Sequence, residues 1–243
     1  MYVFCKKWGV TIVRLPKFFL IGFVVILSLT LFAQGILAET TSTGTSNATV
    51  NFIEDTSIPD VLDPENPNDP FDPGDGDNDP TGNFGPLSLD YVSHLAFGEQ
   101  IVSLENQTYE AKTLQPFIQV TDRRSNPTGW HVSVKATPFA DVGNTNQLTG
   151  ATIQFAMGET LSDLGSMYVA PTTTPFILTT DNVQRNVVSA KSGEGRGSWI
   201  TRWFPISPTT PTTNDSVKLS VPGGIMKATS YSSTLTWTLS DTP

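Results

Sequence analysis

The stretch Ser230–Leu239, SYSSTLTWTL, lies close to the carboxyl end and decides the fold. Every second side chain from Tyr231 to Leu239 falls on one face of an extended strand, and the Ser and Thr residues between them fall on the other. A second stretch, Trp130–Ala136 (WHVSVKA), alternates in the same way. Both patterns predict strands that bury one face, each with a tryptophan on that face.

Between and around these stretches, runs rich in β-branched and aromatic residues are separated by Gly, Pro, Asn and Asp, as is typical of strands joined by turns. Runs of helix-forming residues at helical spacing are absent. The expected strands are His94–Phe97, Ile101–Leu104, Pro116–Thr121, Trp130–Ala136, Thr152–Ala156, Phe176–Thr179, Val187–Ala190, Ser198–Phe204, Val217–Val221 and Ser230–Leu239. We therefore predict an all-β fold, a single β-sandwich or barrel-like domain over residues 85–243.

The amino end has the organisation of a targeting segment. Basic residues between Lys6 and Lys17 precede the apolar run Phe18–Ala33, and Ala38 supplies a small residue at which cleavage can occur. The apolar run is shorter than the roughly 20 residues that span a bilayer. We predict that residues 1–38 are a secretory signal peptide, that the protein is secreted to the cell surface or cell wall, and that it has no stable membrane anchor.

Residues 39–84 read as a spacer. Ten acidic residues and no basic ones lie between Glu54 and Asp79, and prolines recur among them. Proline stiffens the chain and like charges repel, so we expect a disordered, solvated, Pro-rich acidic linker. Without residues 1–38 the chain has 10 basic and 23 acidic residues, a net charge of −13. Most of that excess lies in the spacer, because the sequence from Thr81 onward has 12 acidic and 10 basic residues.

This composition excludes several classes of function. The chain has 23 acidic and 14 basic residues, and this excess of negative charge argues against a nucleic-acid partner. One cysteine, Cys5, and two histidines, His94 and His131, are too few for most metal and nucleophilic sites. We therefore predict no metal, no cofactor and no catalytic residue. A carbohydrate-active enzyme stays as the less favoured alternative, although no spacing of carboxylates singles out a catalytic pair.

Particular residues resemble a known family. They are Leu95-Ala96-Phe97-Gly98, Val120-Thr121-Asp122-Arg123-Arg124, Gly129-Trp130-His131-Val132, Val221-Pro222-Gly223 and the terminal Trp237-Thr238-Leu239-Ser240-Asp241-Thr242-Pro243. With the signal peptide and the acidic linker, this order of motifs is similar to that of the WxL-domain surface proteins of Gram-positive bacteria. The similarity covers the whole predicted domain.

The resemblance implies non-covalent attachment to the cell wall, through peptidoglycan or another wall polymer, by the carboxyl-terminal domain. It points to the two triplets, with Trp130, Val132, Trp237 and Leu239 as candidate binding residues. The first triplet departs from the family pattern, because Val132 stands where Leu is expected. Two readings of the tryptophans stay open: they pack in the core, or they contact the wall polymer directly.

A second aromatic cluster, Trp199 and Trp203 with Arg202 and Arg196, is a further candidate for peptidoglycan binding. Aromatic faces stack on sugars and guanidinium groups pair with carboxylates, provided that the arginines stay in solvent. The alternative is an ordinary strand. We also keep a second function open: a small subunit of a multi-protein cell-surface complex, with other exported proteins as partners, acting in adhesion or in host or polysaccharide interaction.

Overall fold

The computed structural model describes residues 42–71, 79–206 and 211–242, so the predicted signal peptide lies outside the described residues. The chain divides into two units, Met1–Asn51 and Phe52–Pro243. The described part of the first unit, residues 42–51, is exposed and has no regular structure. In the described ranges, no helix has the length and apolar character needed to cross a membrane.

Strands dominate the second unit, which confirms the predicted all-β class. The elements are β1 (Leu87–Val92), β2 (Gln107–Ala111), β3 (Phe117–Asp122), β4 (Trp130–Ala136), β5 (Thr152–Phe155), β6 (Glu159–Ser162), the 3-10 turn η1 (Gly165–Met167), β7 (Thr172–Thr173), β8 (Phe176–Thr179), β9 (Arg185–Ala190), β10 (Gly197–Arg202), β11 (Asn214–Val221) and β12 (Leu235–Ser240). They form three antiparallel four-stranded sheets with the orders β1-β3-β10-β6 (sheet 1), β2-β11-β5-β8 (sheet 2) and β12-β4-β9-β7 (sheet 3).

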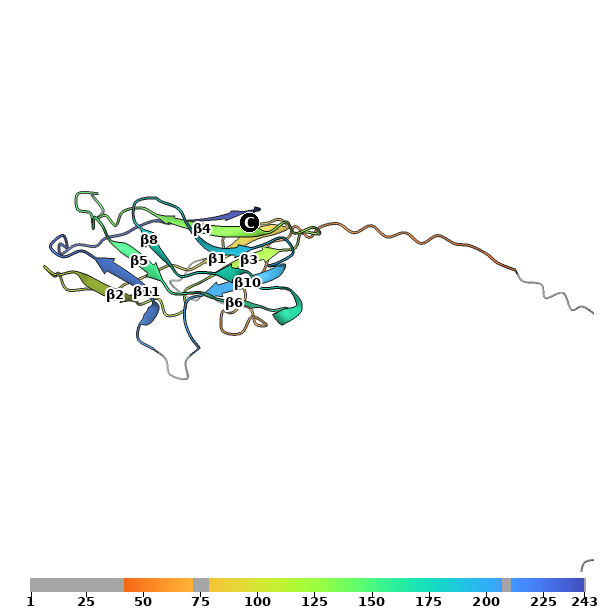
Figure 1. Ribbon diagram of the computed structural model, residues 1–243, viewed down its shortest axis with the longest axis horizontal. Coiled ribbons are helices and arrows are strands. Elements are labelled where there is room, and N and C mark those ends of the chain that lie inside the picture. The colour runs from red at the N-terminus through yellow and green to blue at the C-terminus, as the bar shows by residue number, and fades with distance from the viewer. Residues whose placement is uncertain (1–41, 72–78, 207–210, 243) are drawn as a thin grey trace, which may run out of the picture. The chain divides into compact units, whose positions relative to one another are not determined.

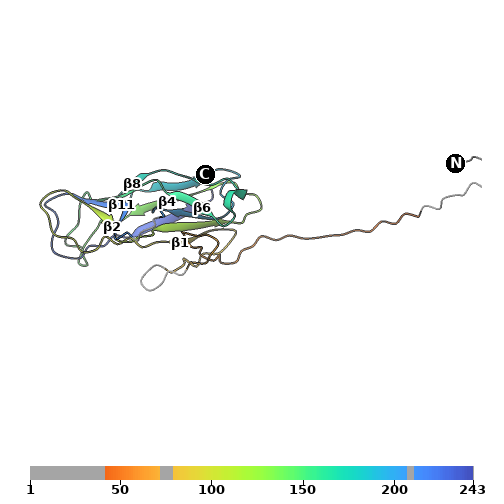
Figure 2. The ribbon, with the colours of Figure 1, turned by 90° about the horizontal axis from the view of Figure 1, so that it is seen from below.

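The three sheets surround one apolar core. Figure 1 places β2, β5, β8 and β11 toward one end of the unit and β1, β3, β6 and β10 toward the other. The perpendicular view in Figure 2 separates β8 from β1, with β4 and β11 between them. Each sheet contributes buried side chains to the shared core, for example Val120 from sheet 1, Ile153 from sheet 2 and Val134 from sheet 3.

The strand predictions are right from Pro116 onward, wrong at two upstream segments, and incomplete, because they omit β1, β2, β6 and β7. Trp130–Ala136 and Phe176–Thr179 match β4 and β8, and the other predicted strands from Pro116 onward overlap observed ones. His94–Phe97 and Ile101–Leu104 are not strands. Ile101 and Leu104 are 90% and 87% exposed, so this apolar run has no buried face of the kind that a strand pattern implies.

Close contacts of the turn before β4 with neighbouring segments fix the position at which β4 begins. The buried Asp122 carboxylate pairs with Arg124, whose guanidinium also donates to the carbonyl oxygen of Gly129. Gly129 has a φ of +98°, and a Cβ there would lie 2.6 Å from the carbonyl oxygen of Ala190. Only glycine tolerates both conditions, so the chain can turn directly into Trp130.

Residues 60–71 form a compact loop on the outer face of sheet 1, which we call the cap loop. Phe71 donates its N–H to the carbonyl oxygen of Val61, and a bridge joins Leu62 to Pro70. Val61 is only 7% exposed and packs with Tyr91, Phe117 and Ile200. The cap loop thus closes a second, smaller apolar cluster.

This docking differs from the expectation that the acidic spacer is solvated throughout. Side chains of sheet 1 hold the cap loop by its backbone: the Gln119 amide accepts from the N–H of Leu62 and donates to the carbonyl oxygen of Asp60. Arg202 donates to the carbonyl oxygen of Pro64. Prolines and acidic residues stay ordered here because the sheet, not the loop, supplies the missing apolar and polar partners.

A buried carboxylate lies beneath the cap loop. Asp90 sits at the β-bulge of β1 and accepts hydrogen bonds from Ser88, Gln119 and Thr121 at 2.6–2.9 Å. Burial raises the pKa of the Asp90 carboxyl, although these three hydrogen bonds and the charge of Arg123 act in the opposite direction. The native state therefore holds this proton more tightly than the unfolded chain.

We expect the cap loop to contribute measurably to stability. Val61→Ala removes two buried methyl groups, so the free energy of unfolding should fall by about 1–2 kcal/mol. Ile58→Ala, at a side chain 59% exposed, is the matched control and should change it by less than about 0.5 kcal/mol. Urea denaturation measures both, and equal effects of the two substitutions would show that the cap loop does not dock.

We expect Asp90 to make stability depend on pH. A raised native pKa gives stabilisation that is complete below the ordinary aspartate range and is lost as the pH rises through the raised value. Relative to Asp90→Asn, which cannot titrate, the wild type should therefore lose unfolding free energy as the pH rises above the ordinary aspartate range of about pH 4. Urea denaturation of both proteins across this rise in pH tests the sign, and a difference that does not change with pH would refute it.

Candidate functional site

The pairing of β4 with β12 brings the two Trp-containing segments together. Trp237 lies opposite Val134 and Leu239 opposite Val132 in an antiparallel register. Trp130 and Trp237 therefore occupy the same face of neighbouring strands, the face turned toward the core. The predicted alternation is confirmed in both strands.

Most of the predicted site residues are buried. Trp130 is 1% exposed, and its indole N–H donates to the carbonyl oxygen of Gly195. Val132, Trp199 and Trp203 are likewise buried. Burial at these positions favours the core reading, in which the side chains shape the domain from within and a wall polymer does not touch them.

The position of Arg202 differs from the predicted one. Its guanidinium was expected to stay in solvent, yet it is buried between Glu159, with an N···O distance of 2.7 Å, and the carbonyl oxygen of Pro64 in the cap loop. Sequence alone does not reveal this, because the partner that covers Arg202 lies in the acidic spacer. Arg196, by contrast, stacks over the ring of Tyr168.

Trp237 and Leu239 are the partly buried members of the predicted set. The Trp237 ring contacts Phe155 and Trp203, with centroids 6.4 and 6.1 Å away. On its other side Trp237 lines a cavity of about 990 Å³. It is thus the one predicted binding residue that reaches both the core and this cavity.

The cavity, which we call the tip groove, lies between the edge strands β2 and β12, where sheets 2 and 3 separate. Its floor is apolar and comes from sheet 2 and the loop after β4: Phe139, Leu148, Ile153, Leu219 and Val221. These side chains are buried in the core cluster. The volume is within the range of small-molecule and oligomer binding sites.

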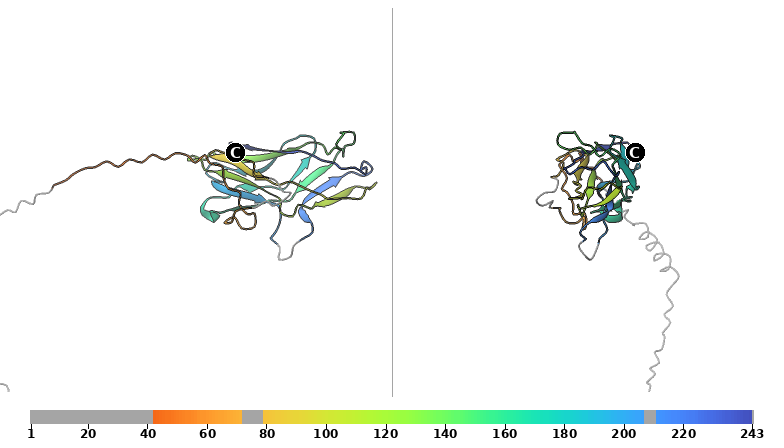
Figure 3. Two further views of the ribbon diagram at one scale, coloured as in Figure 1. Left: turned by 180° about the vertical axis from the view of Figure 1, so that it is seen from behind. Right: turned by 90° about the vertical axis from the view of Figure 1, so that its left-hand side faces the viewer.

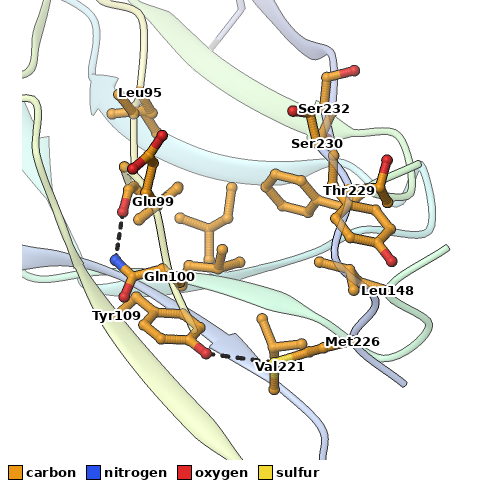
Figure 4. A pocket seen from close by; sticks show the side chains of 18 of the residues that line it. Leu95, Glu99, Gln100, Tyr109, Leu148, Val221, Met226, Thr229, Ser230 and Ser232 are labelled. Atoms are coloured by element: carbon orange, nitrogen blue, oxygen red, sulfur yellow. Dashed lines mark hydrogen bonds between the residues drawn. The ribbon is translucent and has the colours of Figure 1, made fainter. Parts of the chain in front are cut away.

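Two irregular segments form the walls of the tip groove. Residues 92–102 make one wall, and residues 226–235, between β11 and β12, make the other. Figure 4 shows Leu95, Glu99 and Gln100 on one side, facing Ser230 and Ser232 across the open space. The first wall contains the segment His94–Phe97 and the first two residues of Ile101–Leu104, both wrongly predicted as strands, so these residues line the groove instead.

The tyrosine and methionine side chains at the lower part of the tip groove are held in place. The Tyr109 hydroxyl donates to Sδ of Met226 at 3.4 Å, as drawn in Figure 4. The Tyr231 hydroxyl accepts from the N–H of Lys227 at 3.2 Å. These bonds fix two aromatic rings along the groove before any ligand arrives.

The polar lining of the tip groove suits binding. Hydroxyl groups of Ser93, Thr229, Ser230 and Ser232 and two exposed charges, Glu99 and Lys227, border the apolar floor. Within residues 42–71, 79–206 and 211–242, no cluster of three His, Cys, Asp or Glu side chains is placed to hold a metal. An apolar floor with a hydroxyl rim can hold an amphipathic chain by contact and hydrogen bonds.

Comparison with known proteins agrees with this description of a binding domain. The family model described as WxL domain surface cell wall-binding matches residues 39–243. Neither the comparison with curated proteins nor that with solved structures gives a match. The matched range includes the cap loop as well as every strand of the second unit. The chain belongs to the WxL family of cell wall-binding surface proteins.

Proposed function

We propose that this protein attaches non-covalently to peptidoglycan through its carboxyl-terminal domain, and that the tip groove is the contact site. The observation that carries the proposal is the groove itself, a large cavity with an apolar floor and a hydroxyl rim in a member of a wall-binding family. Its lining includes Trp237 from the second Trp-x-Leu triplet. The triplets then act mainly by packing, and Trp237 links that packing to the groove.

The direction of the chain supports this assignment. Glu54 and Asp55 bind Ser125 and Arg123 at the turn between β3 and β4, so the chain reaches the domain at that end. Leu235 and Ala136, paired at the other end of β12 and β4, lie beside the groove. Figure 3 shows the carboxyl end and the turn between β11 and β12 at opposite ends of this unit. Glu54 and Asp55 therefore lie at the end of this unit away from the groove, where they do not obstruct a wall polymer.

We propose a non-catalytic role for the tip groove. Glycoside hydrolysis by the common mechanism uses two carboxyl groups about 5–10 Å apart. The groove lining contributes one carboxylate, Glu99, from the described residues. This composition favours binding of the polymer over its cleavage.

A second candidate function, a subunit of a larger surface complex, has its own support. Strand β8 is an edge of sheet 2, and Ile177 on it is 54% exposed. Met157, just beyond the neighbouring strand β5, is also exposed. An exposed edge strand with apolar side chains is a surface to which another protein can add a strand. Co-purification of a stoichiometric exported partner that Ile177→Lys abolishes would support this function.

We expect a bulky side chain in the tip groove to block wall binding. Ser230 is exposed and lines the groove, so Ser230→Trp should fill it with little effect on folding. Co-sedimentation with purified peptidoglycan should then show a loss of affinity of at least about tenfold, equivalent to 1.4 kcal/mol.

The matched control is Thr236→Trp, which places the same ring on the exposed outer face of β12. It should sediment with peptidoglycan as the wild type does. Wild-type binding by folded Ser230→Trp would exclude the groove as the contact site, and a wild type that stays wholly soluble would exclude peptidoglycan as the ligand.

We expect substitutions of Trp130 and Trp237 to have different effects, the first on stability and the second on wall binding. Trp130→Phe removes the indole N–H that bonds Gly195, so it should cost about 1–3 kcal/mol of unfolding free energy while wall affinity is kept. Trp237→Ala opens the groove floor and should lower wall affinity in protein that circular dichroism shows to be folded. Undiminished binding by folded Trp237→Ala would remove this residue from the site.

A further inference from the structure

The charges of the tip groove are few and opposite in sign. Glu99 lies on the wall formed by residues 92–102, and Lys227 belongs to the opposite wall. Both side chains are exposed, so they can pair with a ligand without a large cost of desolvation. A ligand that satisfies both walls must itself carry a cationic and an anionic group.

This arrangement discriminates among the components of a bacterial wall. A polyanionic wall polymer needs several cations, and one lysine beside one carboxylate does not provide them. A glycan strand without stems carries the lactyl carboxylates of its muramic acid residues but no cation, so it could pair with Lys227 and would leave Glu99 without a partner. A stem peptide that has not been cross-linked carries free carboxylates, a free amine on its diamino acid, and the methyl groups of its alanine residues.

We infer that the tip groove binds the peptide stem of peptidoglycan, and not the glycan strand, with the peptide amine at Glu99 and a peptide carboxylate at Lys227. This inference rests on the proposed function. The small methyl groups of the stem lie on the apolar floor at Leu148 and Val221, beside Met226. The hydroxyl groups of Ser230 and Ser232 donate hydrogen bonds to peptide carbonyl oxygens.

The backbone of the walls adds to this recognition. Residues 97–102 are not part of any strand, and in residues 228–234 the backbone of Ser232 and Thr234 bonds to Ala140 and Thr137, so the first wall offers more backbone groups to a ligand than the second. A peptide presents the same groups at regular intervals, whereas a sugar ring presents hydroxyls at varied angles. A peptide stem can thus exchange hydrogen bonds with water for hydrogen bonds to the walls of the tip groove along its length.

The first experiment separates the stem from the strand. The full chain is sedimented with intact peptidoglycan in the presence of either soluble stem peptide or the soluble glycan strands that an amidase releases from the same material. Displacement by the stem peptide at a concentration at least about tenfold below that needed for the glycan strands supports the inference. Equal or stronger displacement by the glycan strands overturns the inference while keeping the proposed function, and no binding to the intact polymer overturns both.

The second experiment tests the two charges with a soluble stem peptide as the titrant in calorimetry. Glu99→Lys and Lys227→Glu should each weaken binding by at least about fivefold. Lys191→Glu makes the same charge change at an exposed lysine next to the β3–β4 turn, outside the groove, and should leave binding unchanged.

Lys227→Glu should no longer weaken binding to a peptide whose carboxyl groups are all amidated, because the predicted partner is then uncharged. The same loss for Lys191→Glu, or for the amidated peptide, would overturn the assignment.

Discussion

The antiparallel pairing of β4 with β12 is the constraint on which the rest of the structure depends. It joins residues about a hundred positions apart in register, Leu235 opposite Ala136 and Ser240 opposite His131. Because side chains alternate along a strand, this one register sends Trp130 and Trp237 inward together. A shift of the edge strand β12 by one residue would turn Trp237 and Leu239 to solvent, while β9 would still hold Trp130 in place. The family motif is therefore first a folding motif, and its influence on binding passes through the position of Trp237 between the core and the tip groove.

The same core explains why a groove exists at one end only. Large rings, Phe155, Trp203 and Trp237, fill the space between the sheets in the middle of the domain. Toward the far end of β12 the sheets are bordered by irregular segments and not by further strands, so the aliphatic floor stays open to a ligand. At the opposite end the cap loop and the turn between β3 and β4 close the structure. The proposed binding site thus lies at the end of the domain opposite to the cap loop.

Sequence reasoning succeeds for β4 and β12, where apolar and polar side chains alternate within the strand itself. The alternation around Trp130 and Trp237 identifies both strands and their inward faces, because half-burial leaves a period of two. It fails where burial comes from elsewhere in the chain. Arg202 looks exposed until Pro64 is known to cover it, and the 94–104 region looks like strands because a groove wall and a strand need similar apolar side chains. All six residues of β3 are buried. A strand buried on both faces requires a covering layer on each side, and here the cap loop is the layer that sequence reasoning missed.

The central claim is that wall material contacts the domain at the tip groove and not at its other end. Hydrogen–deuterium exchange of the full chain, with and without solubilised peptidoglycan fragments, tests this most directly. The account predicts added protection in residues 95–102 and 226–235, with residues 122–131 and the cap loop unchanged. Protection confined to the β3–β4 turn or the cap loop, with no change in the two groove walls, would contradict it.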